Sequence, residues 1–239
     1  MDEPGTVTRA VRHIDRHGTD DGGLARRICQ ACVDGLDVDG AAISVLTSTV
    51  SRATLWASDA TADLLEDLQF TLNEGACMQA AATGSPVLVP DLYHSADVVR
   101  WPVFAAAVAE QTDAVALFAL PLQWGVVNLG VLDLYRRTPG GLSPEQSRDA
   151  ISAADVAALM MLGVRTEPGD GDGDAWLDPA VRSRAEVHQA TGMVLAQLDV
   201  SAEVALARMR AHAFVEQRLL IDVARDVVSR KLRFTDDMA

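Results

Sequence analysis

The spacing of apolar residues changes along the chain and predicts two kinds of element. In residues 21–36, apolar side chains recur every four positions from Leu24 to Leu36, which predicts a helix with one buried side. Five short apolar runs bounded by turn residues instead predict strands: residues 41–46, 52–57, 86–89, 114–123 and 126–135. Trp124 and Gly125 join the last two runs, so we expect these to pair as long central strands.

Start and stop signals place four further helices among the strands. These cover residues 59–68, 76–82, 100–110 and 144–164. Asp59 is a good N-cap, Gly84 ends the second of these helices, and Ser143 followed by Pro144 typically opens a helix. Residues 21–165 therefore predict a domain of mixed helices and strands.

A charged linker and three more helices follow this domain. Residues 167–174 alternate glycine with acids and have no side chain able to form a core, so we expect a flexible connection. The segment is no calcium loop, because Ala175 and Val181 stand where such a loop needs glycine and glutamate. The predicted helices cover residues 178–199, 201–217 and 219–232.

The middle helix of these three is apolar on two sides. Its two apolar lines consist of Leu206, Met209 and Ala213, and of Val204, Ala207, Ala211 and Phe214. One line suits packing within its own domain, and the other suits a partner. Alanine-rich surface without a partner explains the second line equally well.

Charge is unevenly divided along the chain. With 34 acidic and 20 basic residues the net charge is -14. Residues 1–174 hold 25 acids and 11 bases, which gives -14, whereas residues 175–239 hold 9 of each, which gives zero. A neutral C-terminal part permits contact with a polyanion, although it lacks the basic footprint of a strong nucleic-acid binder.

Residue usage excludes several classes of protein. Lys231 is the only lysine, and it cannot serve as the essential lysine of a Walker-type nucleotidase, a protein kinase or a serine β-lactamase. Three cysteines cannot build a disulfide framework, and no apolar run approaches the roughly 20 residues of a membrane helix. The N-terminus has no signal pattern, so we expect a cytoplasmic protein without membrane contact.

Two groups of motifs resemble known families. The first resembles the GAF sensor domains of actinobacterial regulators and comprises Asn73-Glu-Gly-Ala-Cys-Met-Gln, Thr83-Gly-Ser-Pro-Val, Val89-Pro-Asp-Leu and Arg100-Trp-Pro-Val-Phe. The second resembles the ANTAR domain and comprises Arg184-Ala-Glu-Val-His-Gln-Ala-Thr-Gly192, Ser201, Glu203, Ala205, Met209-Arg210, Ala213 and residues 220–227. The chain is thus similar to GAF-ANTAR transcription antitermination regulators.

This resemblance implies an α+β fold. We expect an N-terminal extension over residues 1–20, a GAF domain with a six-stranded antiparallel sheet and flanking helices over 21–165, a linker over 166–176, and an all-α ANTAR domain of three helices over 177–234. ANTAR domains bind paired hairpins in leader transcripts as dimers and so prevent terminator formation. The implied partners are therefore tandem RNA hairpins, a second copy of the chain and an unknown small molecule in the GAF domain, with no cofactor.

The resemblance also implies residues that contact RNA: Arg184, Gln189, Thr191, Gly192, Arg210, His212 and Arg218. Arginine holds phosphates, while amide and ring groups contact unpaired bases. A solvated or ion-paired role is equally compatible with each of them. Thr191 replaces a lysine usual in the family, which removes one phosphate contact, and the glycine-rich linker replaces a long helix through which many relatives pair.

Two further positions on the first C-terminal helix stand out. Gly192 costs about 1 kcal/mol inside a helix relative to alanine, so we expect the close approach of another helix there. His188 lies in an apolar arc, where a hydrogen-bonded core histidine is more common than a functional one.

In the sensor part, residues on or beside the elements that would enclose a pocket are candidate ligand contacts: Trp56, Phe70, Glu74, Cys77, Trp101, Phe104 and Phe118. Core packing remains an alternative for each aromatic residue. Cys77 at a helix start suits redox sensing, and a buried inert thiol is the alternative.

The functional hypothesis is a ligand-regulated RNA-binding antiterminator. No histidine, cysteine or serine stands in a catalytic motif, so we predict no enzyme activity, no catalytic residues and no metal site. The alternative is a sensor dimer whose C-terminal helices bind a protein or DNA.

Overall fold

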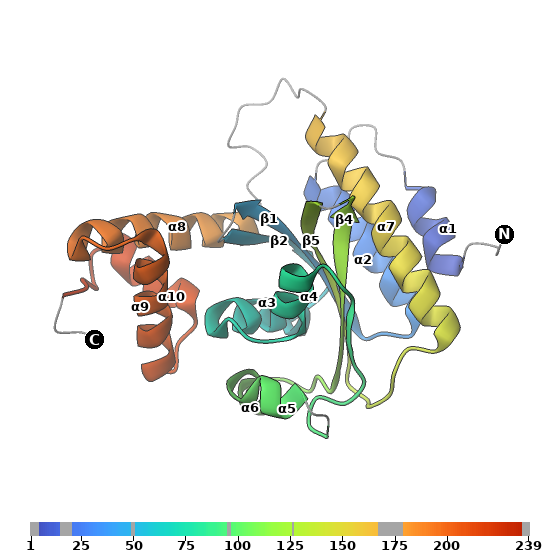
Figure 1. Cartoon of the computed structure of the whole chain (residues 1–239), viewed down its shortest axis with the longest axis horizontal. Helices are drawn as coiled ribbons and strands as arrows, with labels where there is room; N and C mark the ends of the chain where they lie inside the picture. Colours follow the sequence, from blue (N-terminus) through green and yellow to red (C-terminus); the bar gives the residue numbers. More distant parts are fainter. Residues whose placement is uncertain are drawn as a thin grey trace.

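An antiparallel sheet forms the centre of the N-terminal part of the chain (Figure 1). The computed structural model describes residues 5–14, 21–48, 51–94, 97–125, 127–166 and 179–235. The strands are β1 (Gly40–Ser48), β2 (Ser51–Ala57), β3 (Val87–Val89), β4 (Ala116–Trp124) and β5 (Val127–Arg136), in the spatial order β2-β1-β5-β4-β3. Each strand contains most of one apolar run predicted from the sequence. The described residues thus form five strands, not the six that the resemblance implies.

Successive residues of each strand point to opposite faces of the sheet, so the strands serve two cores. In β4, Phe118 and Leu120 face one core, whereas Leu117 and Ala119 face the other. Helices α1 (Thr6–Arg12), α2 (Asp21–Leu36) and α7 (Pro144–Thr166) cover the first face. Helices α3 (Ala60–Leu72), α4 (Ala76–Thr83) and α6 (Pro102–Gln111) cover the second, beside the short α5 (Asp97–Arg100) (Figure 1). We call this three-layer part, residues 5–166, the sheet domain.

Helix α1 lies within residues 1–20, for which the sequence predicts an N-terminal extension. Val7 and Val11, four residues apart, are fully buried in the first core. The Asp149 carboxylate on α7 accepts hydrogen bonds from the N–H groups of Val7 and Thr8, both at 2.9 Å. The packing of α1 on α7 therefore joins residues 142 positions apart in sequence.

The C-terminal helices form a separate bundle, which we call the helical unit (residues 179–235). It contains α8 (Pro179–Leu198), α9 (Ala202–Val215) and α10 (Leu220–Val228). Ser201 caps α9 as predicted, since its hydroxyl accepts a hydrogen bond from the Val204 N–H at 3.3 Å. The third helix ends at Val228, four residues before the predicted end. Figure 1 shows the unit beside α3, away from α1 and α7.

No single helix in the described part of the chain has both the length and the hydropathy to span a bilayer. Residues 186–198 and 202–215 are long and apolar enough only when taken together, and the two helical segments are bent by 104° with respect to each other.

Candidate functional site

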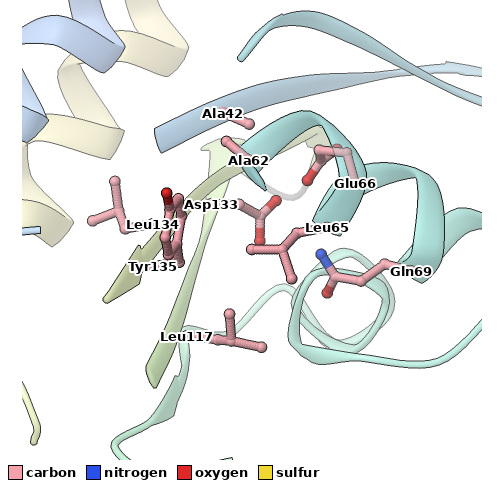
Figure 2. A pocket seen from close by; sticks show the side chains of 9 residues that line it. All are labelled: Ala42, Ala62, Leu65, Glu66, Gln69, Leu117, Asp133, Leu134 and Tyr135. Carbon is pink, nitrogen blue, oxygen red and sulfur yellow. The ribbon is translucent and has the colours of Figure 1, made fainter. Parts of the chain in front are cut away.

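A pocket lies between α3 and the sheet, on the second face (Figure 2). The hollow is small, about 10 Å³, which is roughly the space of one water molecule, and it opens to the surface. Its walls are formed by Ala42, Ala62, Leu65, Glu66, Gln69, Leu117, Asp133, Leu134 and Tyr135. Helix α3 supplies four of these residues at helical spacing, and β5 supplies three, so the pocket depends on the packing of this one helix on the sheet.

The polar groups of the pocket are deeply placed. The Glu66 side chain is only 1% exposed, and its Oε2 accepts a hydrogen bond from the Thr54 hydroxyl at 3.4 Å. Figure 2 shows the carboxylates of Glu66 and Asp133 directed into the hollow. Together with Cys77 Sγ, one oxygen of each carboxylate forms a group of atoms within 4.8 Å of one another, and these three residues could hold a metal ion. The pocket therefore offers acceptors to a ligand that carries donor groups or positive charge.

Hydrogen bonds fix α3 at both ends of the pocket. At its start, the Asp59 side chain accepts from the Ala62 N–H at 2.8 Å and from the Tyr135 hydroxyl at 3.0 Å. Burial, followed by the hydrogen bond to Asp59, raises the pKa of Tyr135 to about 12. The phenol thus stays protonated at neutral pH. Near the end of α3, Gln69 Oε1 accepts from the Cys77 N–H at 2.7 Å.

None of the seven predicted ligand contacts lines this pocket: Trp56, Phe70, Glu74, Cys77, Trp101, Phe104 and Phe118. Trp56 and Phe118 pack on the opposite face of the sheet, where Arg26 and Arg136 lie 6.0 and 5.7 Å from the respective ring centres. The position of each residue in its strand decides which face of the sheet it occupies, and the sequence alone does not show which face carries the pocket.

Four of the seven lie on the same side of the sheet as the pocket. Trp101 and Phe104 are buried in the second core. The Glu74 carboxylate accepts hydrogen bonds at 3.2 and 3.0 Å from two N–H groups at the start of α6, so it caps that helix. Cys77 is fully buried, and its Sγ lies 3.9 Å from Ser44 Oγ, within the group of possible metal ligands.

Phe70, the remaining candidate, reaches into the helical unit. Although it belongs to α3, its ring is part of the core formed by α8, α9 and α10. The Arg210 guanidinium of α9 lies 5.2 Å from the centre of this ring, and the Leu220 N–H at the start of α10 donates to the Thr71 hydroxyl at 3.2 Å. We call this contact the α3 junction, with Phe70, Thr71, Arg210 and Leu220 as its residues.

The predicted RNA contacts on α8 divide into exposed and buried positions. Gln189 and Gly192 are exposed. Thr191 is 9% exposed, and its hydroxyl donates to the Val187 carbonyl at 2.7 Å. The side chain of Arg184 lies outside the part of the chain that the structure describes.

The predicted contacts on and after α9 are half-buried. Arg210 packs on Phe70, and burial lowers the pKa of its guanidinium. Arg218 forms an ion pair of 2.7 Å with Asp226. The His212 ring stands edge-on to Phe234, with 5.4 Å between centres. Each of these groups is thus engaged inside the chain.

Two expectations about α8 are wrong. A Cβ added at Gly192 would meet nothing within 4 Å, so no helix of the described chain approaches it. His188 is exposed and is not a core histidine. Both positions lie on the side of α8 that faces away from its partners, because the neighbouring Val187 and Ala190 fill the core.

Sequence reasoning missed two groups of residues. It did not select Asp133, which stands between Leu132 and Leu134, nor Glu66 and Gln69, which alternate with the leucines of α3. It also passed over the cations Arg230, Lys231 and Arg233, which are exposed. A search for polar residues inside predicted core positions would have found the first group, and a local charge count the second.

Two family models match the chain. A model described as GAF domain matches residues 19–161, and a model described as ANTAR domain matches residues 177–228. Among curated proteins, none matches the sequence.

Solved structures resemble the sheet domain. The GAF domain of a phosphoenolpyruvate-protein phosphotransferase from Coxiella burnetii shares 10% identity and a TM-score of 0.50, with 66% of this chain and 92% of that one covered. The corresponding Acinetobacter GAF domain shares 11% identity and a TM-score of 0.50, with coverage of 67% and 92%. A free methionine-R-sulfoxide reductase from Neisseria meningitidis, solved with its substrate, shares 14% identity and a TM-score of 0.47, covering 66% and 86%. At such identities the likeness concerns the fold alone.

Proposed function

Because the chain belongs to the GAF-ANTAR family of regulators, we propose that it is an RNA-binding transcription antiterminator that recognises paired RNA hairpins under the control of a small ligand. GAF and ANTAR domains are regulatory rather than catalytic, and we expect no turnover of the ligand. The protein acts in the cytoplasm as a homodimer, since two hairpins require two binding units.

The position of α3 is the observation that carries this proposal. Leu65, Glu66 and Gln69 line the pocket, and the next residue, Phe70, enters the core of the helical unit. A ligand that displaces α3 by a fraction of an ångström therefore changes the packing of Phe70 against Arg210. Binding energy at the pocket is in this way coupled to the arrangement of the effector helices.

The α3 junction supports a specific form of control. Arg210 is a candidate phosphate contact, yet here its guanidinium lies on the Phe70 ring and is half-buried. The docked arrangement keeps this cation from RNA, and its release makes the cation available. A ligand favours whichever arrangement it binds more tightly, so the direction of control follows from its relative affinity.

A binding competition tests the RNA-binding function. The full chain is titrated with a synthetic RNA pool in which two stem-loops with randomised loops are joined by a single-stranded spacer. We expect salt-sensitive retention of this RNA, which random-sequence duplex DNA does not compete away. Equal competition by duplex DNA, or no retention at low salt, contradicts the proposal. Sedimentation of the same sample reports whether two copies of the chain accompany each RNA.

One observation favours the alternative in which α9 binds a protein. The second apolar line predicted on α9 is exposed: Val204, Ala207, Ala211 and Phe214. Phe214 is 57% exposed, and Val215 beside it is 73% exposed. An exposed apolar line of this kind suits contact with another protein. If Phe214→Ser leaves RNA binding intact but abolishes an association of the chain, this surface serves assembly and not RNA.

A further inference from the structure

The last seven described residues concentrate the positive charge of the helical unit. Residues 179–235 contain nine bases and six acids, a net charge of +3, and residues 229–235 contain three bases and no acid, which is also +3. The rest of the unit is therefore neutral. We call residues 229–235 the basic segment; it lies beyond the ANTAR match, which ends at residue 228.

The basic segment has a defined backbone course. The Lys231 and Leu232 N–H groups both donate to the Asp226 carbonyl, at 2.8 and 3.0 Å, and close the last turn of α10. The Phe234 N–H donates to Gln197 Oε1 of α8 at 2.9 Å. The Phe234 ring is 2% exposed in the core of the unit. The segment is thus attached at both of its ends.

The apolar side chains of the basic segment are buried or partly buried, and its basic side chains are exposed. Leu232 and Phe234 point into the core, whereas Arg230, Lys231 and Arg233 are exposed. Among the described residues, no ion pair involves any of these three cations. By contrast, other arginines of the unit are paired with carboxylates, such as Arg218 with Asp226 and Arg225 with Glu186. The fold therefore presents three cations on a fixed backbone.

A structural role at the end of α10 does not account for the whole segment. Cations stabilise a helix C-terminus by about 0.3–1 kcal/mol, but the effect falls off within the last turn. That interaction suits Arg230. The interaction with the helix end does not extend to Arg233. This residue follows Leu232 and precedes Phe234, whose N–H donates to Gln197 of α8.

The basic segment is also placed away from the sheet domain. Leu220 at the start of α10 contacts Thr71, and the segment follows the other end of this nine-residue helix. Such a helix is roughly 13 Å long. Figure 1 shows the chain leaving α10 towards the side of the unit that faces away from the sheet. The three cations are therefore accessible while the α3 junction holds Arg210.

We propose that Arg230, Lys231 and Arg233 form a phosphate-binding surface that holds the backbone of an RNA hairpin. This inference rests on the proposed RNA-binding function and names a site for it outside the residues of the ANTAR match. The surface binds RNA without regard to sequence, so loop recognition remains the task of other residues.

The test replaces all three cations in the full chain, as Arg230→Gln, Lys231→Gln and Arg233→Gln, and uses the RNA pool of paired stem-loops. We expect about ten- to hundredfold weaker binding at low salt, and a salt dependence whose log-log slope is smaller by about 2 to 3. The matched control carries the same charge change on exposed arginines of the sheet domain, Arg12→Gln, Arg27→Gln and Arg148→Gln. The variant Arg230→Lys, Arg233→Lys keeps the charge and should keep the affinity.

The outcomes separate the two proposals. If the wild-type chain does not bind the RNA, the proposed function fails and this inference with it. If the wild-type chain binds but the triple variant and its control weaken equally, this inference alone fails. Asp236 and Asp237 follow the segment in the sequence, and their conversion to asparagine should strengthen binding by removing negative charge from its neighbourhood. Unchanged or weaker binding by that variant also speaks against the site.

Discussion

The sheet domain closes its two cores with its own side chains, whereas the helical unit depends on a side chain of its neighbour. Both sheet cores consist almost entirely of residues from the sheet domain, but the core of the unit includes Phe70 from α3. A unit of about 57 residues buries only about 60% of its unfolded surface on folding, less than a larger domain does, and is marginal alone. Its stability is therefore linked to the position of α3.

Polar groups follow the same division. The sheet domain encloses Glu66 and Gln69 beside a pocket, at 1% and 3% exposure. In the helical unit, Arg218 and Arg225 pair with acids, whereas Arg230, Lys231 and Arg233 face solvent. One region thus buries polar groups around a small hollow, the other carries exposed cations, and the α3 junction connects the two.

The largest expected effect comes from removing the shared ring. Phe70→Ala should lower the free energy of unfolding of the helical unit by about 3–5 kcal/mol, because the ring fills a core that contains few other residues. Hydrogen exchange should show this loss in α9 and α10, with the strands less affected.

A matched substitution in the other region sharpens the comparison. Phe118 is equally large and 1% exposed in the first core of the sheet, so Phe118→Ala should lower protection in the strands. The milder Thr71→Val removes the acceptor of the Leu220 N–H and should cost about 1–2 kcal/mol in the unit. Equal loss of protection in both regions for Phe70→Ala and Phe118→Ala means that the two regions unfold as one body.

Alkaline pH should destabilise the sheet domain through its buried thiols and its buried phenol. Burial, followed by the charge of Asp149, raises the pKa of Cys32 from 9.0 to about 12. The folded state thus favours the neutral thiol, and its contribution is full below pH 9 and is lost as the pH rises towards 12. We expect the free energy of unfolding to be about 2–3 kcal/mol lower two pH units above 9 than it is below pH 9. The cysteines and tyrosines of the chain all precede residue 136, so the helical unit has none of these groups.

The measurement is denaturant unfolding of the sheet domain as a function of pH. Burial also raises the pKa of Cys29 well above its ordinary value, and Tyr135 reaches about 12, so both add to the trend. Cys32→Ala should reduce the slope of stability against pH by about one proton between pH 9 and 11. An unchanged slope in this variant means that Cys32 does not cause the effect.

The smallest expected effect concerns the exposed side of α8. Gly192→Ala should stabilise the helical unit by up to about 1 kcal/mol, because the added Cβ meets nothing within 4 Å and alanine favours a helix. Hydrogen exchange in α8, α9 and α10, measured as a function of temperature, reports this gain in stability. Ser152→Ala on the exposed side of α7 is the control for the sheet domain. A loss of stability contradicts the open environment of Gly192, and weaker RNA binding by a stabilised variant places RNA close to this backbone.

The sequence predicted the elements well because each depends on local periodicity. The five apolar runs became five strands, and Asp59 and Ser201 cap the helices that they were expected to open. The helix α1 was missed, since a seven-residue helix offers only Val7 and Val11 as apolar markers. Its position is fixed by Asp149, far away in sequence.

The candidate site was harder to predict because it depends on which side of an element a residue occupies. Aromatic residues were expected around the ligand, yet Trp56 and Phe118 lie on the opposite face of the sheet. The pocket is lined by Glu66 and Asp133, which are polar residues on the buried side of their elements. Strand alternation is visible in a sequence, but the face that carries a particular helix is not.

Sequence by itself determined the order of helices and strands, the division into an acidic sensor part and a neutral effector part, and the family of both, because these follow from local patterns and composition. Tertiary structure alone decided that Phe70 of α3 packs in the core of the helical unit and that Glu66 of α3 lies close to Asp133 of β5. It also decided that residues 229–235 contact α8 through Phe234 and Gln197. The physical reason is that each of these contacts joins segments distant along the chain, and such contacts arise from packing, which local periodicity does not encode.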